Sequence, residues 1–226
     1  MGLMDKLKKN PSTQPPASPV PAASAPAAPA QHSGGTINLT KGQGIKLAKT
    51  QVMTAVCSWP PATDYDVYAL VRYRDGRTET VSTFGTKQDS RFETSTRDGA
   101  VRHLGDVQRS SDAMASETIE IRLTPDVAAV VPVVYSAQSN GAGSFRRYRV
   151  GMSIDNGQGQ KVVIDASNAS DHDNIYTCVP GIILNSDQGV QVNALEQYSR
   201  RGSENRPEIT PDLRVLMDAG PVNAYK

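Results

Sequence analysis

The sequence lacks a long apolar run, a secretory signal and an excess of charge of one sign. Its longest apolar run, VAAVVPVV at residues 127–134, is much shorter than the roughly 20 residues of a membrane-spanning helix and predicts a buried strand. Residues 1–10, MGLMDKLKKN, have no apolar stretch behind their lysines, so a cytoplasmic location is expected. With 24 Lys and Arg against 23 Asp and Glu, no nucleic-acid partner is expected.

Cysteine is also scarce. Cys57 and Cys178 lie far apart in apolar, strand-like surroundings, and neither belongs to a CxxC or a Cys/His spacing. A disulfide or a metal pair is therefore disfavoured, and we expect two buried thiols that pack as small apolar side chains.

Motifs for catalysis are missing as well. The sequence has no GxSxG, no P-loop and no GxGxxG, and its histidines His32, His103 and His172 stand beside no activated nucleophile. DHDN at Asp171 lacks the glycine and the later glutamate of an EF-hand loop. The sequence predicts a protein that is not an enzyme.

The N-terminal part differs in composition from the rest. Residues 11–35 are almost entirely Pro, Ala and Ser, which predicts a disordered, semi-rigid linker. Before it, residues 1–10 carry Leu3 and Leu7 four apart among lysines, the pattern of a short basic amphipathic segment. This segment is a candidate for peripheral contact with the inner membrane or with a protein complex, and a soluble disordered start is the alternative.

Residues 36–226 consist of short β-like runs separated by turns. TINLTKGQGIKLAK predicts a hairpin about KGQG, and DYDVYALVRYRDGRTETVSTF predicts another about Asp75-Gly76. FRRYRVGMSI, KVVIDAS, NIYTCVPGIIL and VQVNALEQYS add further strands. The pattern predicts an all-β domain, a two-sheet β-sandwich with short helical segments at most.

Two acidic groups are candidates for a metal site. Asp64 and Asp66 would point to the same face of a strand, where a hard cation such as Ca²⁺ could bridge them. In RDGAVRHLGD, turns at the glycines could bring Asp98 and Asp106 toward that face. Solvated turns on the surface of a β protein remain the alternative interpretation.

The order of the motifs resembles the TerD family of bacterial tellurium-resistance and stress proteins. That family has a glycine-centred LxKG hairpin, a strand ending in Gly-Trp-Asp, a DLD-type motif opening an apolar strand, and DGSVxHxGDN before an acidic loop. LTKGQGIKLAK, VCSW, DYDVYALV, RDGAVRHLGD and ETIEIRL follow this order over about residues 37–167. The last family motif is matched by Asp98, Gly99, Val101, His103, Gly105 and Asp106.

The resemblance implies a β-sandwich that binds calcium and acts in resistance to tellurite and other stresses without catalysis. The implied calcium ligands are Asp64, Asp66, Asp98, Asp106 and Glu117. The sequence departs from the family at several of its acidic or polar positions, which here hold Pro60, Val107, Ala115 and Ser116, and Arg109 adds a positive charge. Fewer carboxylates predict a weakened calcium site or none.

Two functions stay open at this point. One is a calcium-dependent binding protein, and the other is a metal-independent scaffold domain tethered through residues 1–10. Both imply protein partners, and the oligomeric state is open. An enzyme acting on oxidised tellurium would need a reactive thiol, which Cys57 and Cys178 are not expected to supply.

Overall fold

The computed structural model describes residues 34–61, 63–105, 114–136, 145–169 and 172–224. All regular secondary structure in these ranges is β-strand, which confirms the predicted all-β class. No helix suited to crossing a membrane occurs in the described ranges. The predicted amphipathic segment, residues 1–10, and all but the last two residues of the linker lie outside them.

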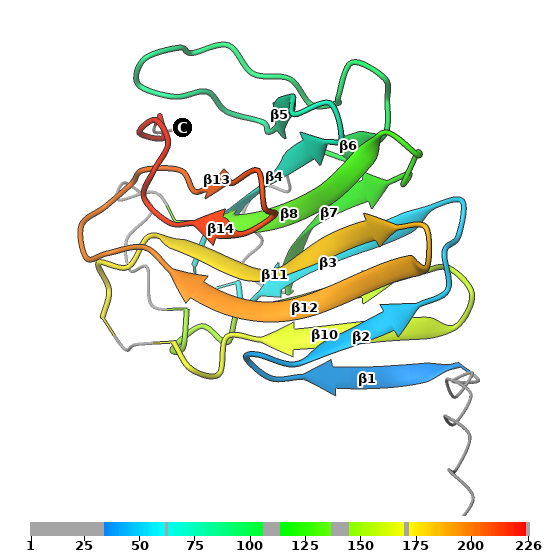
Figure 1. The fold of residues 1–226 in the computed structure, drawn as a ribbon. Coiled ribbons are helices and arrows are strands. Elements are labelled where there is room, and N and C mark those ends of the chain that lie inside the picture. Colours follow the sequence, from blue (N-terminus) through cyan, green and yellow to red (C-terminus); the bar gives the residue numbers. More distant parts are fainter. Residues whose placement is uncertain (1–33, 62, 106–113, 137–144, 170–171, 225–226) are drawn as a thin grey trace, which may run out of the picture. The chain divides into compact units, whose positions relative to one another are not determined.

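The strands form two six-stranded sheets and a two-stranded ribbon (Figure 1). Their bounds are β1 Gly35–Leu39, β2 Gly44–Leu47, β3 Met53–Trp59, β4 Asp66–Tyr73, β5 Thr78–Val81, β6 Val101–His103, β7 Ala115–Ile121, β8 Val127–Tyr135, β9 Gly151–Asp155, β10 Gln160–Asp165, β11 Thr177–Ser186, β12 Gly189–Tyr198, β13 Glu208–Ile209 and β14 Val215–Leu216. The first sheet has the order β1-β10-β9-β3-β7-β6, and the second has the order β2-β12-β11-β8-β4-β5.

The two large sheets pack face to face, so the fold is the predicted β-sandwich. Inward-facing residues of both sheets, among them Trp59, Ile119 and Val134, form one core. Along β3 and β7 the burial alternates from residue to residue, as it does in a strand with one face in the core and the other toward solvent.

The second sheet is covered on its outer face too. All nine residues of β8 are buried, as the apolar run predicts. Tyr68, Leu70 and Val131 belong to a second apolar cluster on this face, together with Ile209 of β13. The C-terminal segment, residues 199–224, carries β13 and β14 across this face (Figure 1).

One predicted hairpin is wrong. β1 and β2 flank the KGQG turn but do not pair, because β1 pairs with β10 in the first sheet and β2 pairs with β12 in the second. The turn carries the chain from one sheet to the other, with Gly42 at a φ of 84°. A hairpin and a turn that connects two sheets both have alternating side chains and a glycine at the turn, so the local pattern could not tell one from the other.

The other predicted hairpin is confirmed. β4 pairs with β5 across Asp75-Gly76, where Gly76 has a φ of 93° that suits glycine. β9 pairs with β10, and β11 pairs with β12. The Asp75-Gly76 turn and the alternation on both sides of it were enough to predict the first of these pairs, whose strands are close in sequence.

Two prolines interrupt the second sheet at one place. Pro132 lies in the central strand β8 and Pro180 lies in the neighbouring strand β11. The register between these strands shifts between Cys178 and Ile183, and the β11–β12 register shifts beside Pro180 as well. A proline donates no backbone hydrogen bond, so an irregular ladder is the arrangement that tolerates both residues.

Candidate functional site

Glu117 and His103 form a buried pair between the sheets. Both side chains are fully buried, and His103 Nε2 lies 3.3 Å from Glu117 Oε2. The same oxygen accepts a hydrogen bond of 2.7 Å from the backbone N–H of Val67 on β4. Glu117 therefore joins β7, β6 and β4. His103 is a packed histidine, and its ring is not accessible to a substrate.

Asp66 lies on the other side of β4. It opens the strand and is 3% exposed. Side chains alternate along a strand, so Asp66 shares its face with Tyr68 and Leu70 of the outer cluster. Glu117 instead shares the inward face of β7 with the core residue Ile119. Asp66 thus points outward from the second sheet, while Glu117 points inward from the first. Half-buried Asp64 precedes Asp66 by two residues.

Asp98 lies toward the far end of β4. Its Oδ1 accepts hydrogen bonds from the hydroxyls of Tyr73 (2.9 Å) and Thr96 (2.8 Å) and from the N–H of Ala100 (3.0 Å). Tyr73 ends β4 and Asp66 begins it, and seven steps of about 3.3 Å separate them by about 23 Å. The side chain of Asp98 forms an Asx turn with the N–H of Ala100, directly before β6.

The hydrogen bonds at Asp98 also stabilise its charge. Burial by itself would raise the pKa of this carboxyl, but the donors on Ala100, Thr96 and Tyr73 together hold the pKa below its usual value.

The predicted calcium ligands that lie in the described ranges are therefore not all gathered in one place. The contacts bring Glu117 to the backbone that follows Asp66, and they keep Asp98 apart from both. Asp106 lies outside the described residues. Within the described ranges, no three Asp, Glu, His or Cys side chains form a group that could hold a metal ion. The calcium site stays a prediction.

Both cysteines are free and buried, which confirms their expected role as packing side chains. Burial raises the pKa of each thiol well above its ordinary value. A thiolate is the reactive form of cysteine, so neither residue is available as a nucleophile in the folded protein.

Sequence reasoning missed one charged residue, Arg206 of the C-terminal segment. Arg206 is 7% exposed and lines two hollows on the outer side of the second sheet. Its surroundings come from parts of the chain far apart in sequence, including Tyr68, Phe84 and Asn223. The segment RGSENRPEI has neither strand alternation nor a known motif, so no local signal marked Arg206.

Comparison with known proteins leaves the family open. No protein-family model matches the chain, and no curated protein matches it. A solved structure described as "Crystal structure of unknown function protein SAV2460" is 16% identical, with a TM-score of 0.46 over 69% of this chain and 92% of that chain. This likeness says nothing about function, and the TerD resemblance continues to depend on the motifs alone.

Proposed function

We propose that the chain is a non-enzymatic, TerD-like binding protein of the stress response, associated with tellurite resistance, whose domain works without calcium. The observation that supports this most is the position of Glu117. The carboxylate that the resemblance assigns to calcium is inside the protein, where it accepts the N–H of Val67 and faces His103. A group engaged in this way stabilises the fold and is poorly placed to bind an ion.

The use of Asp98 supports the same proposal. Calcium takes six to eight oxygen ligands, and carboxylates supply the charge that sets its affinity. Asp98 already accepts three hydrogen bonds at the far end of β4 from Asp66. Glu117 and Asp98, two of the five expected carboxylates, are thus engaged within the protein.

Three side chains that an enzyme could use are also engaged or buried. His103 has no exposed side-chain surface, and the thiols of Cys57 and Cys178 are buried with raised pKa values. These features favour a function in binding over one in catalysis.

Calcium binding at a weakened site is the second candidate. It is favoured by contacts at one end of the sandwich, where Glu117 touches the backbone after Asp66 and His103 accepts the N–H of Gly105 at 3.1 Å. The next residue after Gly105 is Asp106. An ion there would use Asp64, Asp66 and Asp106.

Thermal unfolding of the full chain in calcium and in chelator distinguishes the two candidates. Calcium at about 100 times its dissociation constant would add about 2.7 kcal/mol to the free energy of unfolding. We expect the same midpoint in millimolar calcium and in chelator. A rise of several degrees that Asp66→Asn removes would establish the calcium-dependent form and overturn the proposal.

The tether is tested separately. We propose that residues 1–10 attach the domain to a membrane or a protein complex, with peripheral contact at the inner membrane. Deletion of these residues is expected to reduce co-sedimentation with vesicles containing anionic lipid or with a cell-extract complex, and to leave the unfolding midpoint unchanged. Equal sedimentation of the two forms would dispose of the tether.

A further inference from the structure

Arg206 is a buried cation whose contacts are all with neutral groups. Its Nε donates to Asn223 Oδ1 at 2.6 Å, and its Nη2 donates to the carbonyl oxygens of Phe84 and Gly85, both at 3.0 Å. The rings of Tyr68 and Phe84 lie 4.9 and 5.1 Å from its guanidinium carbon. No carboxylate of the described ranges forms an ion pair with it. A buried charge is normally compensated by an opposite one.

The hydrogen-bond count leaves part of this guanidinium free. Arginine has five N–H donors, and the contacts above use one on Nε and two on Nη2. The two donors on Nη1 have no partner among the residues that the structure describes. Burial also lowers the pKa of Arg206, which reflects the cost of holding the charge away from water.

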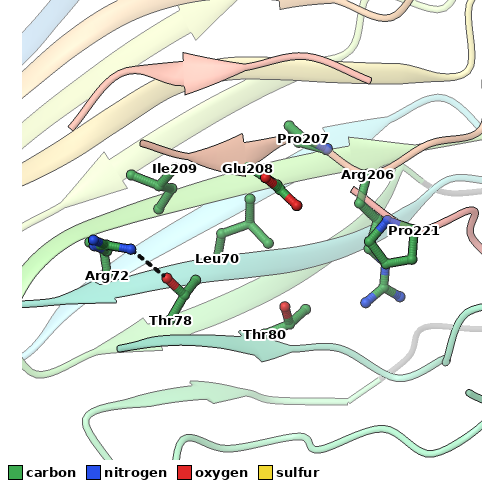
Figure 2. Close-up of a pocket in the computed structure, with 9 residues that line it drawn as sticks. All are labelled: Leu70, Arg72, Thr78, Thr80, Arg206, Pro207, Glu208, Ile209 and Pro221. Atoms are coloured by element: carbon green, nitrogen blue, oxygen red, sulfur yellow. Dashed lines mark hydrogen bonds between the residues drawn. The ribbon is translucent and has the colours of Figure 1, made fainter. Parts of the chain in front are cut away.

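A cavity of about 310 Å³ lies beside this group, between β4, β5 and the C-terminal segment (Figure 2). Figure 2 shows Arg206 and Arg72 on opposite sides of it, with Leu70, Ile209 and Glu208 between them. Leu70 and Ile209 give the cavity an apolar wall. Arg72 is occupied by a hydrogen bond to Thr78 Oγ1 at 3.1 Å.

Thr80 adds a hydroxyl to the same place. Like Arg206, it lines both this cavity and a neighbouring hollow of about 350 Å³. Within the described ranges no hydrogen bond engages its side chain. A hydroxyl and a guanidinium with free donors, set against an apolar wall, are a combination that small-molecule sites use to orient a ligand.

We infer that this cavity binds a small organic monocarboxylate, whose carboxylate accepts hydrogen bonds from Arg206 Nη1 and whose apolar body packs on Leu70 and Ile209. Two guanidinium groups and one carboxylate line the cavity, which leaves one net positive charge for a single negative charge on the ligand. The carboxylate of Glu208 disfavours a dianionic phosphate. A volume at the lower end of the range for ligand pockets, roughly 300–1,000 Å³, fits a free small acid.

The site is separate from the acidic residues considered for calcium, so the two proposals fail independently. The matched probes are 4-methylpentanoate and its uncharged amide, titrated into the full chain by calorimetry. We expect saturable binding of the acid below about 10 mM and binding of the amide at least about tenfold weaker. Equal binding of acid and amide, or tighter binding of inorganic phosphate, would overturn the inference.

Variants of the chain complete the test. Arg206→Gln is expected to weaken binding of the acid at least about tenfold, while Arg122→Gln, a change at an exposed residue directly after β7, leaves it unchanged. Thr80→Val removes the hydroxyl without touching the contacts of Arg206 and is expected to weaken binding severalfold. If Arg206→Gln loosens the C-terminal segment, the effect of Thr80→Val on binding of the acid tests the inference in its place. If binding of the acid is absent, or is the same in all variants, Arg206 is only a structural clamp.

Discussion

Glu117 and Arg206 are both buried charges, but their surroundings differ. Glu117 is 1% exposed and lies between the sheets, with a backbone N–H and His103 at one of its oxygens. Arg206 is 7% exposed and lies under the C-terminal segment, with neutral acceptors and a cavity around it. The comparison separates a charge that holds strands together from a charge that is still available to a ligand.

The two charges also differ in how the sequence reveals them. Glu117 was predicted to be functional because its motif resembles a family, and the contacts give it a structural part to play. Arg206 has no motif, and the contacts with the described residues leave two of its donors without a partner. The resemblance drew attention to Glu117 but could not show which groups lie next to it.

Glu117→Ala is expected to have the largest effect. It leaves the Val67 N–H and the His103 ring N–H buried without their acceptor, and each buried donor left unsatisfied costs about 1–3 kcal/mol. Urea unfolding monitored by tryptophan fluorescence, with Trp59 as the reporter, measures it. The control is Glu120→Ala, which removes a partly exposed ion pair and should cost less than about 1 kcal/mol. Equal losses of stability for Glu117→Ala and Glu120→Ala would contradict the role of Glu117 as a charge that holds strands together.

Arg206→Gln is expected to cost less stability than Glu117→Ala. The change breaks hydrogen bonds to the carbonyls of Phe84 and Gly85, but it leaves no unpaired charge behind, so a loss of about 1–3 kcal/mol is expected. The same urea titration measures this loss. Hydrogen exchange should locate the effect in the C-terminal segment. A loss as large as that of Glu117→Ala would mean that Arg206 is as deeply integrated in the fold as Glu117.

Asp98→Asn extends the comparison of the two buried charges to a charge whose side chain is exposed. The folded-state pKa of Asp98 lies below its usual value, so the carboxylate stabilises the fold above that usual value, about 3.9, and the contribution is lost as pH falls through the folded-state pKa. Because the side chain is exposed, solvent screening keeps the expected loss near or below about 1 kcal/mol at pH 7. The difference between the variant and the natural chain should disappear at a pH well below the folded-state pKa. A difference that persists at that pH would assign the effect to shape and not to charge.

Local patterns predicted much of the fold. The apolar run at β8 and the turn at Asp75-Gly76 depend on neighbouring residues, and both predictions were confirmed. The connection of β1 and β2 to different sheets was missed because the partners of these strands, β10 and β12, lie more than a hundred residues away along the chain.

The candidate site could be predicted only in part, for the same reason. Asp98-Gly99 carries the sequence signal of an Asx turn, which explains its hydrogen bonds to Thr96 and Ala100. The Tyr73 hydroxyl that completes this arrangement, and the Phe84 and Gly85 carbonyls at Arg206, come from distant segments. Contacts of that kind are set by tertiary packing and leave no periodic trace in the sequence.

Direct titration of calcium into the chelator-treated full chain tests the central claim, that the carboxylates resembling calcium ligands serve the fold. The account predicts no saturable heat up to about 1 mM calcium, a concentration at which even weak sites fill. Binding with a dissociation constant of about 10⁻⁵ M or tighter, abolished by Asp66→Asn, would contradict it.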